Sequence, residues 1–284
     1  MLLNPHYGAP AMRVMTETPD IRRAFLGQQR RMMSTAAALN DQQLLAPSRC
    51  EGWSAADVLE HLGGVAQFWM MSIAAGVAGE PTTVLSGFDP EATPREMVAG
   101  SDAASVSHVR EQYLAAATQL DQTIAALSDD EWATIVEAPP GHVTIGTMLH
   151  HALWDCWTHE RDIVLPLGIE PVEDPVEVTC VLAHAIGLTA AFAMQFADSR
   201  SARIGVLAVD PLVELTVNVA RTTVVSFDSP PAGVPVLTGS AVDLAEGITC
   251  RQPLDLSSLG EQAWVVEGLA EVFAPAGPSE VERD

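Results

Sequence analysis

The spacing of apolar residues predicts four long helices in the first part of the chain. In each stretch apolar residues recur at helical spacing, and capping or helix-breaking residues stand at the ends. Ser54 with Asp57 three residues later forms a Ser-x-x-acid capping pattern at the start of the second stretch. Four successive amphipathic helices favour a helix bundle. The predicted helices cover residues 20–39, 54 to about 78, 93–127 with an interruption near residue 100, and 144–165.

The pattern changes after an acidic, proline-rich stretch at residues 168–175. A further helix is predicted from Pro175 to about Ala197, because proline suits the first turn of a helix. Short alternating apolar runs then predict three strands joined as a hairpin or meander. Further helical segments are expected from Ser240 and near residues 261–273. The three predicted strands cover residues 202–209, 212–220 and 222–228.

These elements predict an α+β protein with two domains. Residues 1–170 would form the four-helix bundle, and residues 171–284 a smaller α/β domain with a short antiparallel sheet. The final eight residues are expected to be frayed.

Two polar residues interrupt the apolar face of the fourth predicted helix. Met148, Ala152, Asp155, His159 and Ile163 all fall on one face at helical spacing, and the aspartate and histidine occupy its middle. On the second helix, His61 points along an apolar stripe that includes Val58, Leu62, Val65 and Trp69.

Burying an ionised carboxylate without a partner is costly, so Asp155 requires pairing, protonation or a metal ion. Asp155 and His159 lie one helical turn apart and can reach one cation, with His61 as a third ligand. Three protein ligands leave a coordination position open, as in catalytic zinc sites. The alternative from spacing alone is that Asp155 and His159 simply hydrogen-bond to each other.

Two motifs around these residues resemble those of a known family. "CEGWSAADVLEHLGG" is similar to the Gly-Trp-(Ser/Thr)-x-x-Asp-x-x-x-His-Leu signature of the mycothiol-dependent maleylpyruvate isomerases. "WDCWTHERDI" is similar to the acid-x-x-x-His-x-x-Asp-(Leu/Ile) signature of the same family. The amino-terminal half of that family belongs to the DinB-like four-helix metalloproteins, so the resemblance implies a DinB-like bundle.

The resemblance implies that His61, Asp155 and His159 bind a divalent metal, with zinc expected. The prototype isomerases have glutamate where this chain has Asp155, which is one methylene shorter. Near the carboxyl end, "LTGSAVDLAEGITCRQPLD" resembles a stretch of the family's second domain that ends in an arginine. Arg251 is therefore implied as a catalytic residue at the domain interface, where it would hold a carboxylate; the alternative is a surface arginine.

Several neighbours of the three candidate ligands have two interpretations. Asp57 could accept the second ring proton of His61 or cap its helix, and Asp162 could orient His159 or pair with an arginine. His151 could be a substitute ligand, a proton carrier or a partly exposed histidine. Cys156 points away from the face that carries Asp155 and is predicted to be a core residue.

Charge and composition exclude several classes of function. A net charge of −23 with no lysine and no basic stripe argues against nucleic acid as a partner. The sequence lacks an uninterrupted apolar run of about 18 residues, the length that a membrane span needs. The first residues do not resemble a secretory signal. We therefore expect a cytoplasmic protein, a monomer or homodimer, with a small-molecule substrate. Cys50, Cys156, Cys180 and Cys250 form no C-x-x-C pair and are expected to be reduced thiols.

The resemblance implies an enzyme that uses mycothiol, a low-molecular-weight thiol, as a metal-activated thiolate. In the isomerases the thiolate adds to an activated double bond, the resulting single bond rotates, and elimination restores the alkene as trans. Related transferases release the adduct as a thioether. Two alternatives stay open: a DinB-like metal hydrolase without a thiol, and a non-catalytic ligand-binding protein with a sterol-carrier-like second domain.

Overall fold

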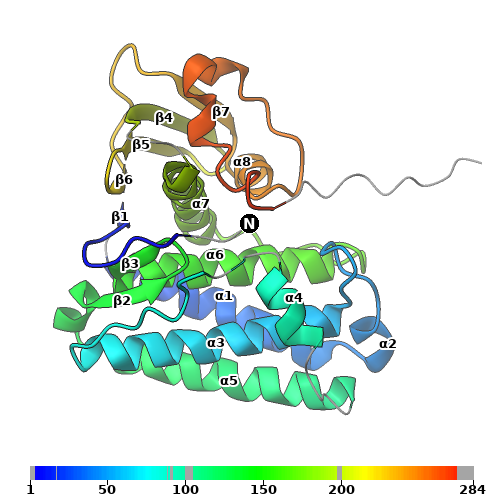
Figure 1. Ribbon diagram of the computed structural model, residues 1–284. Helices are drawn as coiled ribbons and strands as arrows, with labels where there is room; N and C mark the ends of the chain where they lie inside the picture. Colours follow the sequence, from blue (N-terminus) through cyan, green and yellow to red (C-terminus); the bar gives the residue numbers. More distant parts are fainter. Residues whose placement is uncertain are drawn as a thin grey trace, which may run out of the picture.

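The computed structural model describes residues 4–16, 18–87, 89, 92–99, 105–196 and 200–273. Within the described residues, four long helices pack against one another as a bundle in the lower half (Figure 1), which confirms the predicted bundle. These helices are α1 (Thr18–Ala38), α3 (Ala55–Val77), α5 (Val106–Ala126) and α6 (Ile145–Val164), accompanied by the short helices α2 (Asp41–Leu44) and α4 (Ala92–Ala99) and the 3₁₀ helix η1 (Asp129–Ala133).

The caps predicted from the sequence set the starts of the two helices that carry the candidate ligands. Ser54 accepts a hydrogen bond from the backbone N–H of Asp57, and the Asp57 carboxylate accepts one from the backbone N–H of Ser54, which completes a capping box on α3. Thr144 caps α6 through the N–H of Thr147. The third predicted helix is divided into α4 and α5, and the predicted interruption near residue 100 lies outside the described residues.

A hairpin precedes α6 where a loop was expected from the sequence. Strands β2 (Ile135–Ala138) and β3 (Gly141–Thr144) pair antiparallel across Pro139 and Pro140. Gly141 has a φ of +124°, and a β-carbon at this position would lie 2.1 Å from the His6 carbonyl oxygen. The hairpin is only four residues on each side, too short for alternation to stand out in the sequence.

Helix α7 (Pro175–Phe196) lies between the bundle and the sheet (Figure 1). It contacts α1 and α6 on one side and strands of the sheet on the other. By length and hydropathy, Pro175–Gln195 would be able to cross a membrane, but 89% of the apolar window is buried inside the protein. Packing on both sides accounts for its apolar sequence.

The sheet formed by the described residues has five strands in the order β1-β6-β5-β4-β7. The three strands predicted from the sequence form its antiparallel centre, and a strand on each side pairs parallel with it. One of these, β1, comes from the amino terminus: its Met12 pairs with Thr223, so the sheet is mixed and draws on both ends of the chain. The strands are β1 (Met12–Met15), β4 (Ala202–Val209), β5 (Val213–Val219), β6 (Thr223–Ser226) and β7 (Val236–Ser240).

The carboxyl-terminal elements are shorter than predicted. Helix α8 (Ala241–Ile248) follows β7 with Ser240 as its cap, as expected. The segment expected to be helical near 261–273 is instead the 3₁₀ helix η2 (Ser257–Val265) followed by turns. Gly268 lies so close to α7 that an added β-carbon would be 2.0 Å from the Thr189 carbonyl oxygen. The division into domains at residue 170 stays a proposal, and β1 belongs by pairing to the carboxyl-terminal sheet.

Buried ion pairs join α8 to the bundle. Glu246 on α8 accepts two hydrogen bonds from the Arg49 guanidinium, at 2.7 and 3.0 Å, and one from Arg161 Nε of α6 at 2.6 Å. The Glu246 side chain is only 8% exposed. Asp162 of α6 binds the same Arg49 and also Arg251, which follows α8. This network fixes the carboxyl-terminal part against the end of α6 that carries the candidate ligands.

We expect Glu246→Gln to lower the free energy of unfolding by about 3–5 kcal/mol, because it leaves the buried charge of Arg161 and the partly buried charge of Arg49 with a weaker partner. The matched control is Glu173→Gln, which removes the other carboxylate bound to Arg161. Glu173 is 49% exposed, so its loss should cost under about 1 kcal/mol. Urea unfolding of both variants provides the measurement, and equal small losses would contradict this role of Glu246.

Candidate metal centre

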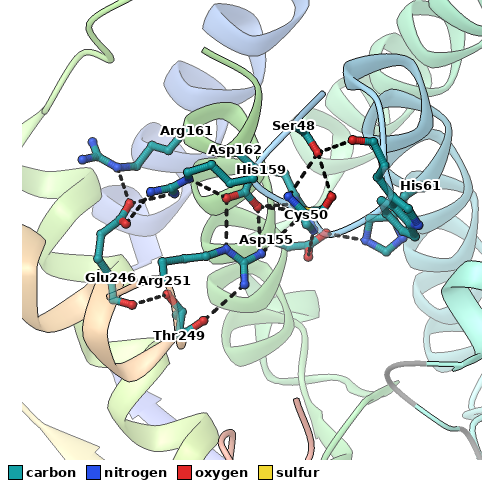
Figure 2. Close-up of polar contacts among 12 residues, drawn as sticks. Ser48, Cys50, His61, Asp155, His159, Arg161, Asp162, Glu246, Thr249 and Arg251 are labelled. Atoms are coloured by element: carbon teal, nitrogen blue, oxygen red, sulfur yellow. Dashed lines mark hydrogen bonds and ion pairs between the residues drawn. The ribbon is translucent and has the colours of Figure 1, made fainter. Parts of the chain in front are cut away.

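The structure brings His61, Asp155 and His159 together from two helices (Figure 2). His61 Nε2 on α3 lies 3.8 Å from Asp155 Oδ2, and His159 Nε2 lies 3.5 Å from Asp155 Oδ1 on α6. The two imidazole rings meet edge to face with centroids 5.0 Å apart. One potential ligand atom from each residue lies within 4.8 Å of the others. This is the spatial cluster that the helical spacing predicted.

Asp155 is buried, and its Oδ2 atom has no hydrogen-bond partner within the described part of the chain. Burial tends to raise the pKa of this carboxyl, but His61 and His159 outweigh it and lower the pKa to about 2. Asp155 is therefore an ionised carboxylate at neutral pH with one oxygen unsatisfied. A divalent cation among the three side chains would supply the missing partner, so the residues present fit a metal ion.

Asp162 fixes the orientation of His159. The Nδ1 atom of His159 lies 3.0 Å from Asp162 Oδ2, and Asp162 is fully buried. When Nδ1–H donates to the carboxylate, Nε2 is the ring atom that faces Asp155 and can bind a metal. Burial tends to lower the pKa of His159, but Cys50 and Asp162 raise it to about 10, so a metal ion would displace the proton from Nε2. Asp162 at the same time accepts two hydrogen bonds from Arg251, at 3.0 Å from Nε and 2.7 Å from Nη2. Asp162 therefore both orients His159 and pairs with an arginine, the two interpretations that the sequence left open.

A second group of potential ligands shares His159. Cys50 Sγ lies 3.2 Å from Asp162 Oδ2 and 3.7 Å from His159 Nδ1, on the opposite side of the ring from Asp155. The guanidiniums of Arg49 and Arg251 already bind Asp162 here, and Arg251 Nη2 lies 3.8 Å from Cys50 Sγ. Two neighbouring positive charges disfavour a cation at this point. Electrostatics thus favours the group with His61 and Asp155.

The remaining sequence candidates have clear positions. Asp57 serves the capping box of α3, and no hydrogen bond joins it to His61 in the described part of the chain. His151 is buried rather than partly exposed, and Cys156 is a core residue whose pKa burial raises well above its usual value. The four cysteines are free thiols, as predicted.

Arg251 lies at the junction between α8 and the bundle, as the resemblance implied. Its bidentate partner is Asp162 of the chain itself, and the third contact is to the Thr249 carbonyl oxygen at 3.3 Å (Figure 2). Burial tends to lower the pKa of Arg251, and Asp162 raises it by more, so the guanidinium is a permanent positive charge. Arg251 does bind a carboxylate, but that carboxylate is Asp162 of the same chain. A role of Arg251 in binding a substrate stays a proposal.

A cavity of about 620 Å³ opens beside the three candidate ligands. The bundle contributes the ligand cluster and the aromatic side chains Trp69 and Trp154. The carboxyl-terminal part contributes apolar residues of α7 and turns after η2, together with Arg251. Its volume is in the range of small-molecule sites, about 300–1,000 Å³. The apolar residues from the carboxyl-terminal side are Leu188, Phe192, Leu269 and Phe273.

Sequence reasoning missed the residues that surround the predicted ligands. Arg49 and Glu246 are paired across 197 positions, and no local pattern marks such a partner. Cys50 is the first residue of the stretch quoted as the first motif, but only the fold brings it to His159. His184 lies against His151, and no spacing in the sequence marks this pair.

Comparisons with known proteins agree with this geometry. The family model described as the mycothiol maleylpyruvate isomerase N-terminal domain matches residues 25–164. Among solved structures, the chain is similar to the mycothiol-dependent maleylpyruvate isomerase and to a histidine-to-alanine mutant of it. Each comparison has a TM-score of 0.59 and 14% identity and covers 84% of this chain and 90% of the other. At this identity the structural likeness shows a shared fold. No curated protein sequence matches the chain.

The matched segment runs from α1 to the last residue of α6 and contains His61, Asp155 and His159. The chain therefore belongs, through residues 25–164, to the family of mycothiol maleylpyruvate isomerase N-terminal domains.

Proposed function

We propose that the protein is a metal-dependent enzyme that uses mycothiol, either to isomerise a maleylpyruvate-like substrate or to transfer the thiol sulfur to an electrophile. The observation that carries the proposal is the cluster of His61, Asp155 and His159 at the wall of a 620 Å³ cavity. Its fold and family support the same conclusion. Cytoplasmic localisation and zinc as the metal belong to this proposal.

The three side chains suit zinc in number and kind: two imidazoles and one carboxylate leave a position for a further ligand. A metal ion with an open position binds a thiol as its thiolate and so provides a nucleophile at neutral pH. Asp155 is already ionised, and the contact of His159 Nδ1 with Asp162 leaves Nε2 facing Asp155. Aspartate replaces the glutamate of the prototype isomerases. Its unpartnered Oδ2 lies 3.8 Å from His61 Nε2, and its Oδ1 lies 3.5 Å from His159 Nε2.

The cavity supplies the remaining requirements for such a reaction. Its walls include Trp69 and Trp154 from the bundle and Leu188 and Phe192 from α7, which make the surroundings of the reacting atoms less polar than water. Arg251 adds a positive charge at the same wall, although Asp162 occupies its bidentate face. We propose that Arg251 acts by attracting an anionic substrate or thiol carboxylate through its charge.

The unpartnered oxygen of Asp155 predicts a zinc site with about one ion per chain. In His61→Ala and Asp155→Asn, zinc affinity should fall by more than the roughly 10–100-fold that loss of an outer hydrogen-bond partner costs. Asp155→Glu should retain binding, because the longer acid keeps its charge. Isothermal titration of the metal-free protein gives these values.

The control for this titration is His108→Ala, which removes an exposed histidine on α5. Its zinc affinity should equal that of the unchanged protein. Equal affinities for all four variants would show that zinc binds elsewhere.

Mycothiol binding should depend on zinc if the thiol is activated there. We expect the zinc-loaded protein to bind mycothiol at least about tenfold more tightly than the metal-free protein, because the thiolate–metal contact is lost in the latter. Equal affinity in both forms would contradict thiol activation. Zinc-dependent hydrolysis without a thiol would instead favour the metal hydrolase, and binding of an apolar molecule without zinc would favour the ligand-binding protein.

A further inference from the structure

Two buried histidines, His151 and His184, lie next to each other beside the candidate metal centre. His151 lies on α6 one turn before Asp155 and lines the same cavity. Its Nδ1 atom lies 3.1 Å from Nε2 of His184, which is on α7 and 1% exposed. Hydrogen bonding to His184 therefore fixes the ring of His151 at the cavity wall.

Aromatic rings hold this pair in place. The ring of His151 meets Trp69, Trp154 and His184 edge to face, with centroid distances of 5.3, 5.1 and 4.9 Å. Three ring neighbours around one imidazole leave little room for another rotamer. His151 is held by these contacts and is not a member of the candidate ligand cluster.

Both histidines are neutral in this environment. Burial lowers the pKa of His151 to about 4, although Asp155 acts in the opposite direction. Burial also lowers the pKa of His184 well below its usual value. Each ring therefore carries a single N–H, and the hydrogen bond between them admits two arrangements.

The surroundings favour one arrangement. If His151 Nδ1–H were the donor, His184 would carry its proton on Nδ1, which is buried with no partner in the described part of the chain. An orphaned N–H is the rarer defect in protein interiors. If His184 Nε2–H is the donor, His151 carries its proton on Nε2, the atom not bonded to His184. That arrangement leaves the N–H of His151 on the ring atom that is not bonded to α7, in a side chain that lines the cavity.

We propose that His151, held by His184, donates its Nε2–H to the carbonyl oxygen of the substrate and stabilises the negative charge that forms there. The inference rests on the proposed function. When a thiolate adds to an alkene conjugated with a carbonyl group, the sulfur–carbon bond forms and the alkene π electrons move onto the carbonyl oxygen. Elimination returns these electrons and breaks the sulfur–carbon bond.

The proton stays on His151 throughout these steps, so a neutral imidazole with a low pKa suits the role. A donor directed at developing charge in a site without water is worth about 10²–10³ in kcat. His150, the preceding residue, is also buried but is bound to the Gly146 carbonyl oxygen and is not among the residues that line the cavity. It therefore provides a matched control.

The positioning is tested without any turnover by long-range ¹H–¹⁵N NMR of the metal-free protein at pH 7. We expect His151 to be neutral with its proton on Nε2, and His184→Phe to produce a mixture of tautomers. A proton on Nδ1 of His151, or a positively charged ring, would overturn the proposal even if the enzyme is active.

The catalytic role is tested by zinc- and mycothiol-dependent turnover of a carbonyl-conjugated cis alkene. His151→Leu should lower kcat by about 10²–10³ with zinc stoichiometry and mycothiol affinity unchanged. His151→Gln should recover most of the loss because its amide offers an N–H at a similar distance, and His150→Leu should leave kcat within about threefold. Equal kcat in His151→Leu and the unchanged protein would contradict this role alone. Absence of thiol-dependent turnover in the unchanged protein would contradict the proposed function and this role with it.

Discussion

A buried, ionised carboxylate on α6 is the constraint on which the rest of the site depends. Asp155 lies on a helix that is buried along most of its length, and one of its oxygens has no partner among the described residues. A bundle core does not retain such a charge without positive neighbours, because desolvation of an ion costs several kcal/mol. His61 and His159 face this carboxylate from two helices. The proposed metal ion would neutralise the remaining negative charge of Asp155 and bind its unpartnered oxygen.

The same logic extends outward from Asp155 to the carboxyl-terminal part of the chain. Asp162 binds His159 on one side and Arg251 on the other, so the ligand cluster is linked by hydrogen bonds to the segment after α8. Glu246 repeats the arrangement with Arg49 and Arg161. One network of charged side chains therefore orients the candidate ligand His159 and also joins α8 to the bundle. Displacement of α8 would disturb His159 through Arg251 and Asp162.

The sequence predicted those parts of the structure that local pattern determines. Helical spacing placed Asp155 and His159 on one inward face, and the capping pattern of Ser54 and Asp57 gave the start of α3; both are confirmed. Pairs of residues far apart in the sequence could not be predicted from local patterns. Strand β1 finds its partner at Thr223, and Arg49 finds Glu246, through contacts that leave no periodic signal. Assignment of His61, Asp155 and His159 as metal ligands stays a prediction, supported by their convergence.

X-ray absorption at the zinc edge of the zinc-loaded protein tests the central claim most directly. The account predicts two imidazole nitrogens at about 2.0–2.1 Å and carboxylate or water oxygens at about 2.0–2.2 Å, with no sulfur until mycothiol is added. Added thiol should then contribute one sulfur at about 2.3 Å. A sulfur at that distance before any thiol is present would place zinc at Cys50, His159 and Asp162 instead, and would contradict the account.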